Sequence, residues 1–244
     1  MSLSWRRTRA IIVKELQDYR RNRFLIVTMM FLPMLFIALP SIQILTAPVS
    51  IVSSRLDARI GISLLYMLLI PAFLPSVMSA YSVVGEREQG TLEPILTTPV
   101  RREEFLLAKA LAIAIPTITI AYALFGVFLL IAALFAHHGI QVAVFAGSHL
   151  LVQLVFTPLI GGWSIWVGIA ISARSSDVRL AQQLSVLASM PPLAVVALMN
   201  FNIISSSLVL SLGLAVALLL VDVLGWRLVA ILFDRERLIT DARS

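Results

Sequence analysis

Long stretches without a charged residue alternate with short charged segments along this chain. A helix that crosses the hydrocarbon core of a bilayer needs about 20 apolar residues at ~1.5 Å each. Two of the uncharged stretches fit one such span apiece, and two longer ones fit two spans each around a polar break near 137–141 or 200–207. The pattern therefore predicts six spans. The four stretches are 24–54, 60–85, 110–173 and 180–221.

The composition supports this interpretation. Hydrophobic residues make up 59% of the 244 residues and charged residues 13%, whereas soluble domains have about 45–50% and about 25%. The stretches are apolar throughout rather than alternating, which excludes a transmembrane β-barrel. We expect an all-α membrane protein with a surface helix at 1–23, one transmembrane domain at 24–233 and a cytoplasmic tail at 234–244. Its spans would lie near 24–45, 61–84, 105–135, 148–173, 182–200 and 207–232.

The placement of the basic residues predicts the orientation. Of the 19 Lys and Arg residues, only Arg55 and Arg59 lie in a loop that follows an odd-numbered span. The others lie before the first span, after the second or fourth span, or after the sixth. Cytoplasmic loops are enriched in Lys and Arg. We therefore expect a multi-pass protein of the cell (inner or plasma) membrane, with both termini in the cytoplasm. The net charge of +6 then reflects topology and lipid contact rather than a nucleic-acid partner.

The first 23 residues have an amphipathic pattern. On a helical wheel, Trp5, Ile12, Leu16 and Tyr19 share one narrow face, and basic residues such as Lys14 occupy the broad opposite side. This pattern is typical of a helix that lies on the cytoplasmic leaflet with its basic side toward anionic headgroups. The alternative is a solvated basic segment that only sets the topology.

The loop after the second span, 85–105, holds most of the remaining charge. Thr91 can cap a helix, Pro94 is tolerated in its first turn, and Pro99 ends it. The predicted helix of about two turns is too short to be stable alone in water. Its apolar side, formed by Leu92, Ile95 and Leu96, suggests docking into the groove of a partner. The alternative is a solvated loop that packs on its own helix ends.

The arrangement of these segments resembles the permease subunit of type 2 ATP-binding-cassette (ABC) exporters. That family has an N-terminal elbow helix, to which Lys14-Glu15-Leu16 is similar, six spans, and a Glu-x-Glu-x-Gly-Thr pattern after the second span. Further similar features are Phe105 and Lys109 at the start of the third span and the close at 227–236. The loop residues that match the pattern or flank it are Glu86, Glu88, Gly90, Thr91, Leu92, Glu93, Ile95, Leu96 and Pro99.

The resemblance implies that this loop is the coupling helix, seated in a cleft of a separate ATPase subunit. Glu86 and Glu88 would make polar contacts to neighbouring helix ends or to the ATPase. A phosphate-binding loop needs Gly-Lys-Ser/Thr, and neither Lys14 nor Lys109 follows a glycine. We therefore expect no enzyme activity and no cofactor in this chain, with ATP and Mg bound by the partner. The complete transporter would contain two permeases, as a homodimer or heterodimer, and two ATPases within membrane lipids.

The same resemblance places the substrate path between the two permeases, lined by the second and fifth spans. The polar or bulky residues there are Tyr66, Met67, Met190, Met199 and Asn200. The apolar spans favour export of a hydrophobic or amphipathic cargo, such as a lipid, drug or antibiotic. The alternatives are a permease for haem export or cytochrome assembly, and an intramembrane enzyme.

A few further residues invite a chemical interpretation. Asp222 is an acid well inside a span, and we weigh a local structural role against a substrate or proton role. His137, His138 and His149 have no carboxylate near them in the sequence, so we expect no metal site. Gly161 and Gly162 do not match a serine-hydrolase elbow and are expected to allow close helix packing.

Overall fold

The computed structural model describes residues 5–48, 53–88, 90, 102–201, 203 and 208–232. In this part of the chain every regular element is helical, and six helical segments are long and apolar enough to cross a membrane. The prediction of an all-α membrane protein with six spans is therefore confirmed. The elements are α1 (Trp5–Arg21), α2 (Arg23–Leu45), α3 (Ser53–Ala80), the π-helix η1 (Tyr81–Gly85), α4 (Glu86–Glu88), α6 (Arg102–Phe135), α7 (His138–Val144), α8 (Gly147–Arg174), α9 (Val178–Ala188), α10 (Met190–Asn200) and α11 (Leu208–Leu232).

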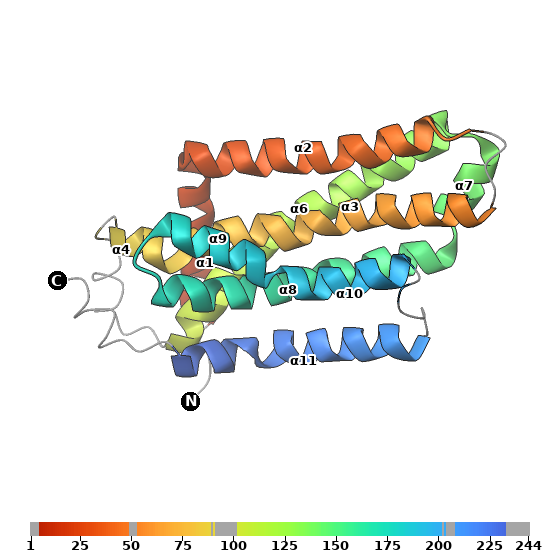
Figure 1. Ribbon diagram of the computed structural model, residues 1–244. Helices are drawn as coiled ribbons and strands as arrows, with labels where there is room; N and C mark the ends of the chain where they lie inside the picture. Colours follow the sequence, from red (N-terminus) through yellow and green to blue (C-terminus); the bar gives the residue numbers. More distant parts are fainter. Residues whose placement is uncertain are drawn as a thin grey trace.

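The long helices lie side by side, and α1 runs across one end of the bundle (Figure 1). The last turn of α11 lies at this same end, which also holds α4 and the start of α6; we call it the α1 end. The short helix α7 lies at the opposite end, together with the starts of α3, α8 and α11; we call it the α7 end. The first amphipathic helix, the end of the second span and the start of the third therefore lie at one end of the bundle.

The helix α3 is the centre of the bundle. It packs against α2, α6, α8, α9 and α10. Within the most apolar 18 residues of each span, 72% are buried in the span Leu56–Glu88 and only 11% in Val209–Arg227. Since most of α11 is not covered by this chain, it is left to face lipid or another protein.

At its α1 end α3 continues into the wide turns of η1. A π-helix leaves backbone groups without their usual α-helical partners. Here α8 supplies one: the Ser172 hydroxyl accepts hydrogen bonds from the amides of Val83 (3.2 Å) and Val84 (3.1 Å) and donates one to the carbonyl of Ala80 (2.8 Å). The end of the second span is therefore fastened to α8.

Two breaks differ from the sequence-based expectation. Most of the predicted polar turn near 137–141 is helical, since α7 begins at His138, and the Gln141 side chain donates to the carbonyls of Ala133 (2.9 Å) and Ala136 (3.0 Å) at the end of α6. The fifth span consists of two helices, α9 and α10, that meet at Ser189. The cause is local, because two prolines follow Ser189 within the first turn of α10.

Candidate functional site

The predicted coupling helix lies outside the described residues, since Thr91, Leu92, Glu93, Ile95, Leu96 and Pro99 fall in 91–101. The structure describes the segments on both sides of it. On the first side Gly90 has a φ of 67°, in the left-handed region that favours glycine, and its amide donates to the carbonyl of Arg87 (3.0 Å). The chain therefore turns sharply out of α4 at Gly90 before it enters this loop.

A group of four charged side chains lies at the α1 end, where α1, α4 and α6 meet. Lys109 of α6 is fully buried, and its Nζ lies 3.1 Å from Oε1 of Glu15 and 2.9 Å from Oε2 of Glu86. Lys14 contributes a second ammonium, 2.7 Å from Oε1 of Glu86 and 3.3 Å from Oε1 of Glu15. We call Lys14, Glu15, Glu86 and Lys109 the charge cluster. The pairing of opposite charges offsets the cost of burying Glu15, Glu86 and Lys109, while Lys14 is 43% exposed and also contacts Asp18 at 3.0 Å.

The helical spacing of α1 explains how Glu15 reaches the cluster. The buried residues of this helix are Thr8, Ile12, Glu15 and Tyr19, which form one face. Ile12 and Tyr19 share a hydrophobic core with Phe105 of α6. Between them, Glu15 is placed beside Lys109 rather than in water. The Lys109 ammonium also lies 4.9 Å from the centre of the Phe105 ring, within the range of a cation–π contact.

The electrostatics of the cluster favour its charged form. Burial alone would raise the pKa of Glu15, but the ammonium groups of Lys109 and Lys14 hold it below its ordinary value of 4.5. Burial alone would lower the pKa of Lys14, and Glu15 and Glu86 instead raise it above 10.5. Burial, with Glu15 and Glu86 nearby, raises the pKa of the Tyr19 hydroxyl well above 10.0. At neutral pH Glu15 and Lys14 are therefore charged, and Tyr19 beside them is neutral.

A second ion pair ties α1 to α6. The Arg7 guanidinium lies 2.9 Å from Oε1 of Glu104, whose side chain is fully buried. The neighbouring Glu103 is only half-buried. Because Arg7 and Glu15 hold α6 at two separate places, α1 and the first turns of α6 form one framework.

The first side of the loop, α4, is also held by α8 and α9. Arg87 donates to the carbonyls of Ser175 (3.1 Å) and Ala173 (3.3 Å) at the end of α8. Oε1 of Glu88 accepts from the amide of Val178 (3.1 Å), in the first turn of α9. Both Glu86 and Glu88 thus make polar contacts within the chain, Glu86 to the charge cluster and Glu88 to a helix start.

The predicted membrane face of α1 is divided. Ile12 and Tyr19 are buried against the protein, so this part of the face covers α6 rather than lipid. Leu16 is half-buried at the edge of the same core, and Trp5 is 66% exposed. A helical pattern within one segment cannot show that a neighbouring helix occupies part of its apolar face.

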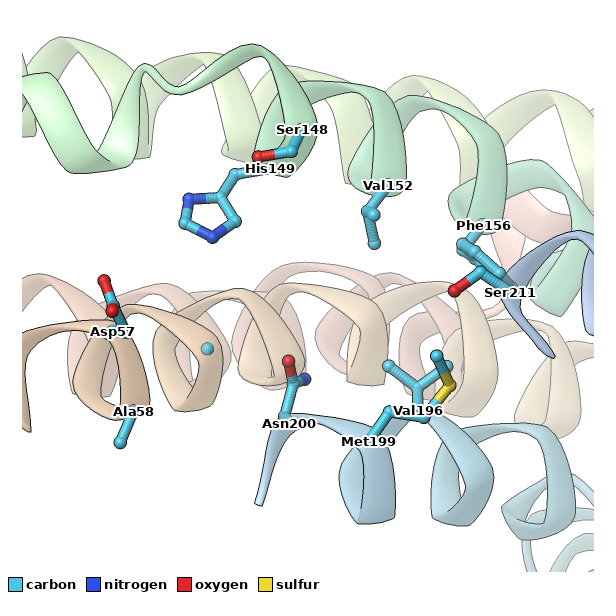
Figure 2. A pocket seen from close by; sticks show the side chains of 11 residues that line it. Asp57, Ala58, Ser148, His149, Val152, Phe156, Val196, Met199, Asn200 and Ser211 are labelled. Carbon is cyan, nitrogen blue, oxygen red and sulfur yellow. The ribbon is translucent and has the colours of Figure 1, made fainter. Parts of the chain in front are cut away.

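The five residues predicted for the substrate path lie in different surroundings. Met67 is buried in a core cluster with Phe125 and Phe128 and does not line an open surface. Tyr66 and Met190 are half-buried. Met199 and Asn200 lie together at the α7 end, where they line a cavity between α3, α8, α10 and α11 (Figure 2).

Asp222 packs against a glycine of α8. A Cβ added to Gly162 would collide with the Asp222 carboxylate, and a Cβ added to Gly225 would collide with the Trp166 ring. The Trp166 indole donates to the Asp222 carbonyl (3.2 Å). Arg227, five residues further on, lies over the Trp226 ring at 5.0 Å. The glycines therefore let α8 and α11 approach closely around Asp222.

The whole arrangement matches a known family. The family model described as ABC-2 family transporter protein matches residues 9–233, from within α1 to the residue after α11. A comparison with curated proteins finds no match. The matched region covers nearly the entire chain, including both helices that form the framework around 89–101. The chain therefore belongs to the ABC-2 family of transporter proteins.

Proposed function

We propose that this chain is the permease subunit of an ABC exporter in the cell membrane, driven by a separate ATPase subunit. The observation that carries the proposal is the family match over residues 9–233 together with the six apolar helices. Members of this family are membrane components of transporters. ATP and Mg would be bound by the ATPase, because this chain has no Gly-Lys-Ser/Thr sequence.

The segment 89–101 is proposed as the coupling element. Its first side continues from α3 through η1 and α4, and its second side continues into α6. The charge cluster joins these two sides, since Lys109 of α6 contacts Glu86 of α4. A displacement of the loop by the ATPase would therefore be transmitted to the second span, the third span and α1 together. Removing one member of a buried ion pair costs about 3–5 kcal/mol, so these elements are expected to move as one unit.

The proposed assembly has two permeases and two ATPases. A single chain of six spans leaves large apolar surfaces uncovered, above all on α11, α2 and α6, where only 11%, 22% and 22% of the most apolar residues are buried. Lipid and a second permease would cover these surfaces, with the substrate path between the two permeases. The apolar character of the spans favours a hydrophobic or amphipathic cargo, and export is the proposed direction.

The substitution Leu96→Glu tests the coupling proposal. A carboxylate on the apolar side of the loop helix would be buried without a partner in the ATPase groove, so assembly should weaken by at least about tenfold. The measurement is co-purification of the ATPase, with transport into vesicles as a second readout. Glu103→Ala, on a half-buried side chain beyond Pro99, is the control and should change little. Normal ATPase binding and normal transport by an inserted Leu96→Glu variant would exclude this loop as the coupling element.

The proposed orientation can be tested by cysteine labelling, because the chain has no native Cys. A cysteine at 98 or 177 should be protected from a membrane-impermeant reagent in intact cells. One at 138 should be labelled, since 138 lies at the α7 end. Labelling at 98 from outside would reverse the proposed topology without affecting the family assignment.

A further inference from the structure

A cavity of about 450 Å³ opens at the α7 end of the bundle. Its walls come from α3, α8, α10 and α11, four helices that are distant in the sequence (Figure 2). Ligand pockets for drug-sized molecules have volumes of about 300–1,000 Å³. The cavity is separate from the charge cluster, which lies at the other end of the molecule. Its size is suitable for a small organic molecule or for part of a larger one.

The lining is more polar near Asp57 and His149 than near Val152 and Phe156, where the Ser211 hydroxyl is the polar group. On α8, His149, Val152 and Phe156 follow one another at spacings of three and four residues, so they share one face. At ~1.5 Å per residue, Phe156 lies about 10 Å deeper along α8 than His149. Figure 2 shows Asp57 of α3 facing the His149 end, and Val196 of α10 across from Val152 and Phe156.

The polarity of the lining residues on α3 and α8 matches the depth at which each residue lies in its membrane-spanning helix. Asp57 and His149 lie within the first turns of their spans, Leu56–Glu88 and Gly147–Arg174. A carboxylate is costly in the centre of a bilayer but much less so at the boundary with water. Val152 and Phe156 lie one and two turns further in. An amphipathic molecule in the cavity would thus keep the orientation that it has in the membrane itself.

The polar end is rich in hydrogen-bond acceptors. Nδ1 of His149 lies 2.8 Å from the carbonyl of Ala143 in α7. A carbonyl only accepts, so Nδ1 is the donor in this contact, and the acceptors at this end of the cavity are the side-chain oxygens of Asp57, Ser148 and Asn200. Asp57 is exposed and is the only charged side chain among the lining residues that the structure describes. A negative group with acceptors beside it favours a ligand that donates hydrogen bonds and carries a positive charge.

We propose that this cavity binds amphipathic amines, with the ammonium group at Asp57 and the apolar body against Val152, Phe156 and Val196. The inference deepens the proposed function, since it names a class of substrate for the exporter. The ammonium could belong to a free amine or to the headgroup of phosphatidylethanolamine. Both share the chemistry that the cavity recognises, and the test below separates them.

The test is direct binding to the full chain in nanodiscs of phosphatidylcholine. The probe is monodansylcadaverine, a primary amine with an apolar fluorophore. Its matched control is dansyl-6-aminohexanoic acid, in which a carboxylate replaces the amine. We expect saturable fluorescence enhancement with the amine and binding of the acid that is weaker by about tenfold. Asp57→Asn should weaken amine binding by about tenfold and leave acid binding unchanged or stronger.

A second variant tests the position of the apolar body. Val152→Trp should fill the cavity and abolish saturable binding, whereas Leu151→Trp should not. Leu151 is the matched control because it is 63% exposed on the same helix and does not line the cavity. If the Val152→Trp variant does not insert into the membrane, amine binding by the Asp57→Asn variant still tests the proposal. Competition by phosphatidylethanolamine in the nanodiscs would identify the lipid as a source of the amine.

Two outcomes would overturn the inference. In the first, amine and acid bind equally and Asp57→Asn has no effect; the cavity is then a site for acyl chains. In the second, Val152→Trp separates a dimer of this chain without affecting probe binding; the cavity is then part of an interface. Neither result requires ATP, so the binding assay can fail while ATP-driven transport stands. Conversely, if the chain binds the amine but no ATPase co-purifies with it from its own cells, the site stands and the proposed function fails.

Discussion

The two ends of this bundle use the same types of side chain in opposite ways. At the α1 end, carboxylates and ammonium groups are buried and paired, as Glu15, Glu86 and Glu104 show. At the α7 end, Asp57 is exposed beside a cavity, and no ion pair is found for it among the described residues. Burial with a partner fixes the relative positions of helices, whereas exposure beside a cavity leaves a charge available to a ligand. The difference suggests that one end transmits motion and the other receives a molecule.

The comparison predicts the largest loss of stability at Lys109. Lys109→Met would leave Glu15 and Glu86 with Lys14 as the remaining ammonium of the cluster, at a cost of about 3–5 kcal/mol. Thermal unfolding in detergent measures this loss. Lys14→Met is the matched control, since 43% of the Lys14 side chain is exposed and water can replace part of its interaction. Equal stability of Lys109→Met and the unaltered chain would show that the cluster does not hold this end together.

A smaller effect is expected at the second tie between α1 and α6. Glu104→Gln removes the charge that faces Arg7, and we expect a loss of about 1 kcal/mol because the Arg7 side chain is partly exposed and water can solvate it. Proteolysis within α1, followed over time, should become faster. The adjacent Glu103→Gln should be nearly silent. If both variants behave alike, the pair between Arg7 and Glu104 does not contribute to the framework.

The smallest effect on stability is expected at the other end. Asp57→Asn should change the unfolding temperature little, within about 0.5 kcal/mol, because an exposed carboxylate has no partner to lose. The same variant should lower amine binding. A large loss of stability at Asp57 would mean that both ends depend on their charges for structure, and the comparison would then have no functional meaning.

The number of spans could be predicted from the sequence because uncharged stretches are a local property. Helix α7 was not predicted, since a helix this short depends on how neighbouring helices pack. The break at Ser189 was not predicted either, although Pro191 and Pro192 are a local signal for it, because membrane helices often continue through prolines. The polar residues near 137–141 suggested a turn, and Gln141 instead caps the end of α6. The number of spans could therefore be predicted from the sequence, whereas the structure between α6 and α8 depends on tertiary contacts.

The charge cluster was not predicted as a unit. Its members are up to 95 positions apart, and helical periodicity compares only residues within a few turns. One local signal was present: Glu15 shares a helical face with Ile12 and Tyr19, which is unusual for a charge that remains in water. Lys109 gave another, because it lies among the apolar residues of a predicted span. Each suggested a buried charge, but only the folded chain shows that the two are partners.

The π-helix Tyr81–Gly85 has a geometric consequence for the loop that follows it. A π-turn accommodates one residue more than an α-turn, and an α-helix rotates by about 100° per residue. In an uninterrupted α-helix, Glu86 would therefore lie about 100° further around the axis, away from the direction it now has toward Lys109. A single additional residue thus sets the phase of the helix. The number of residues in this turn determines the direction in which Glu86 points, and it does so independently of the strength of the attraction between Glu86 and Lys109.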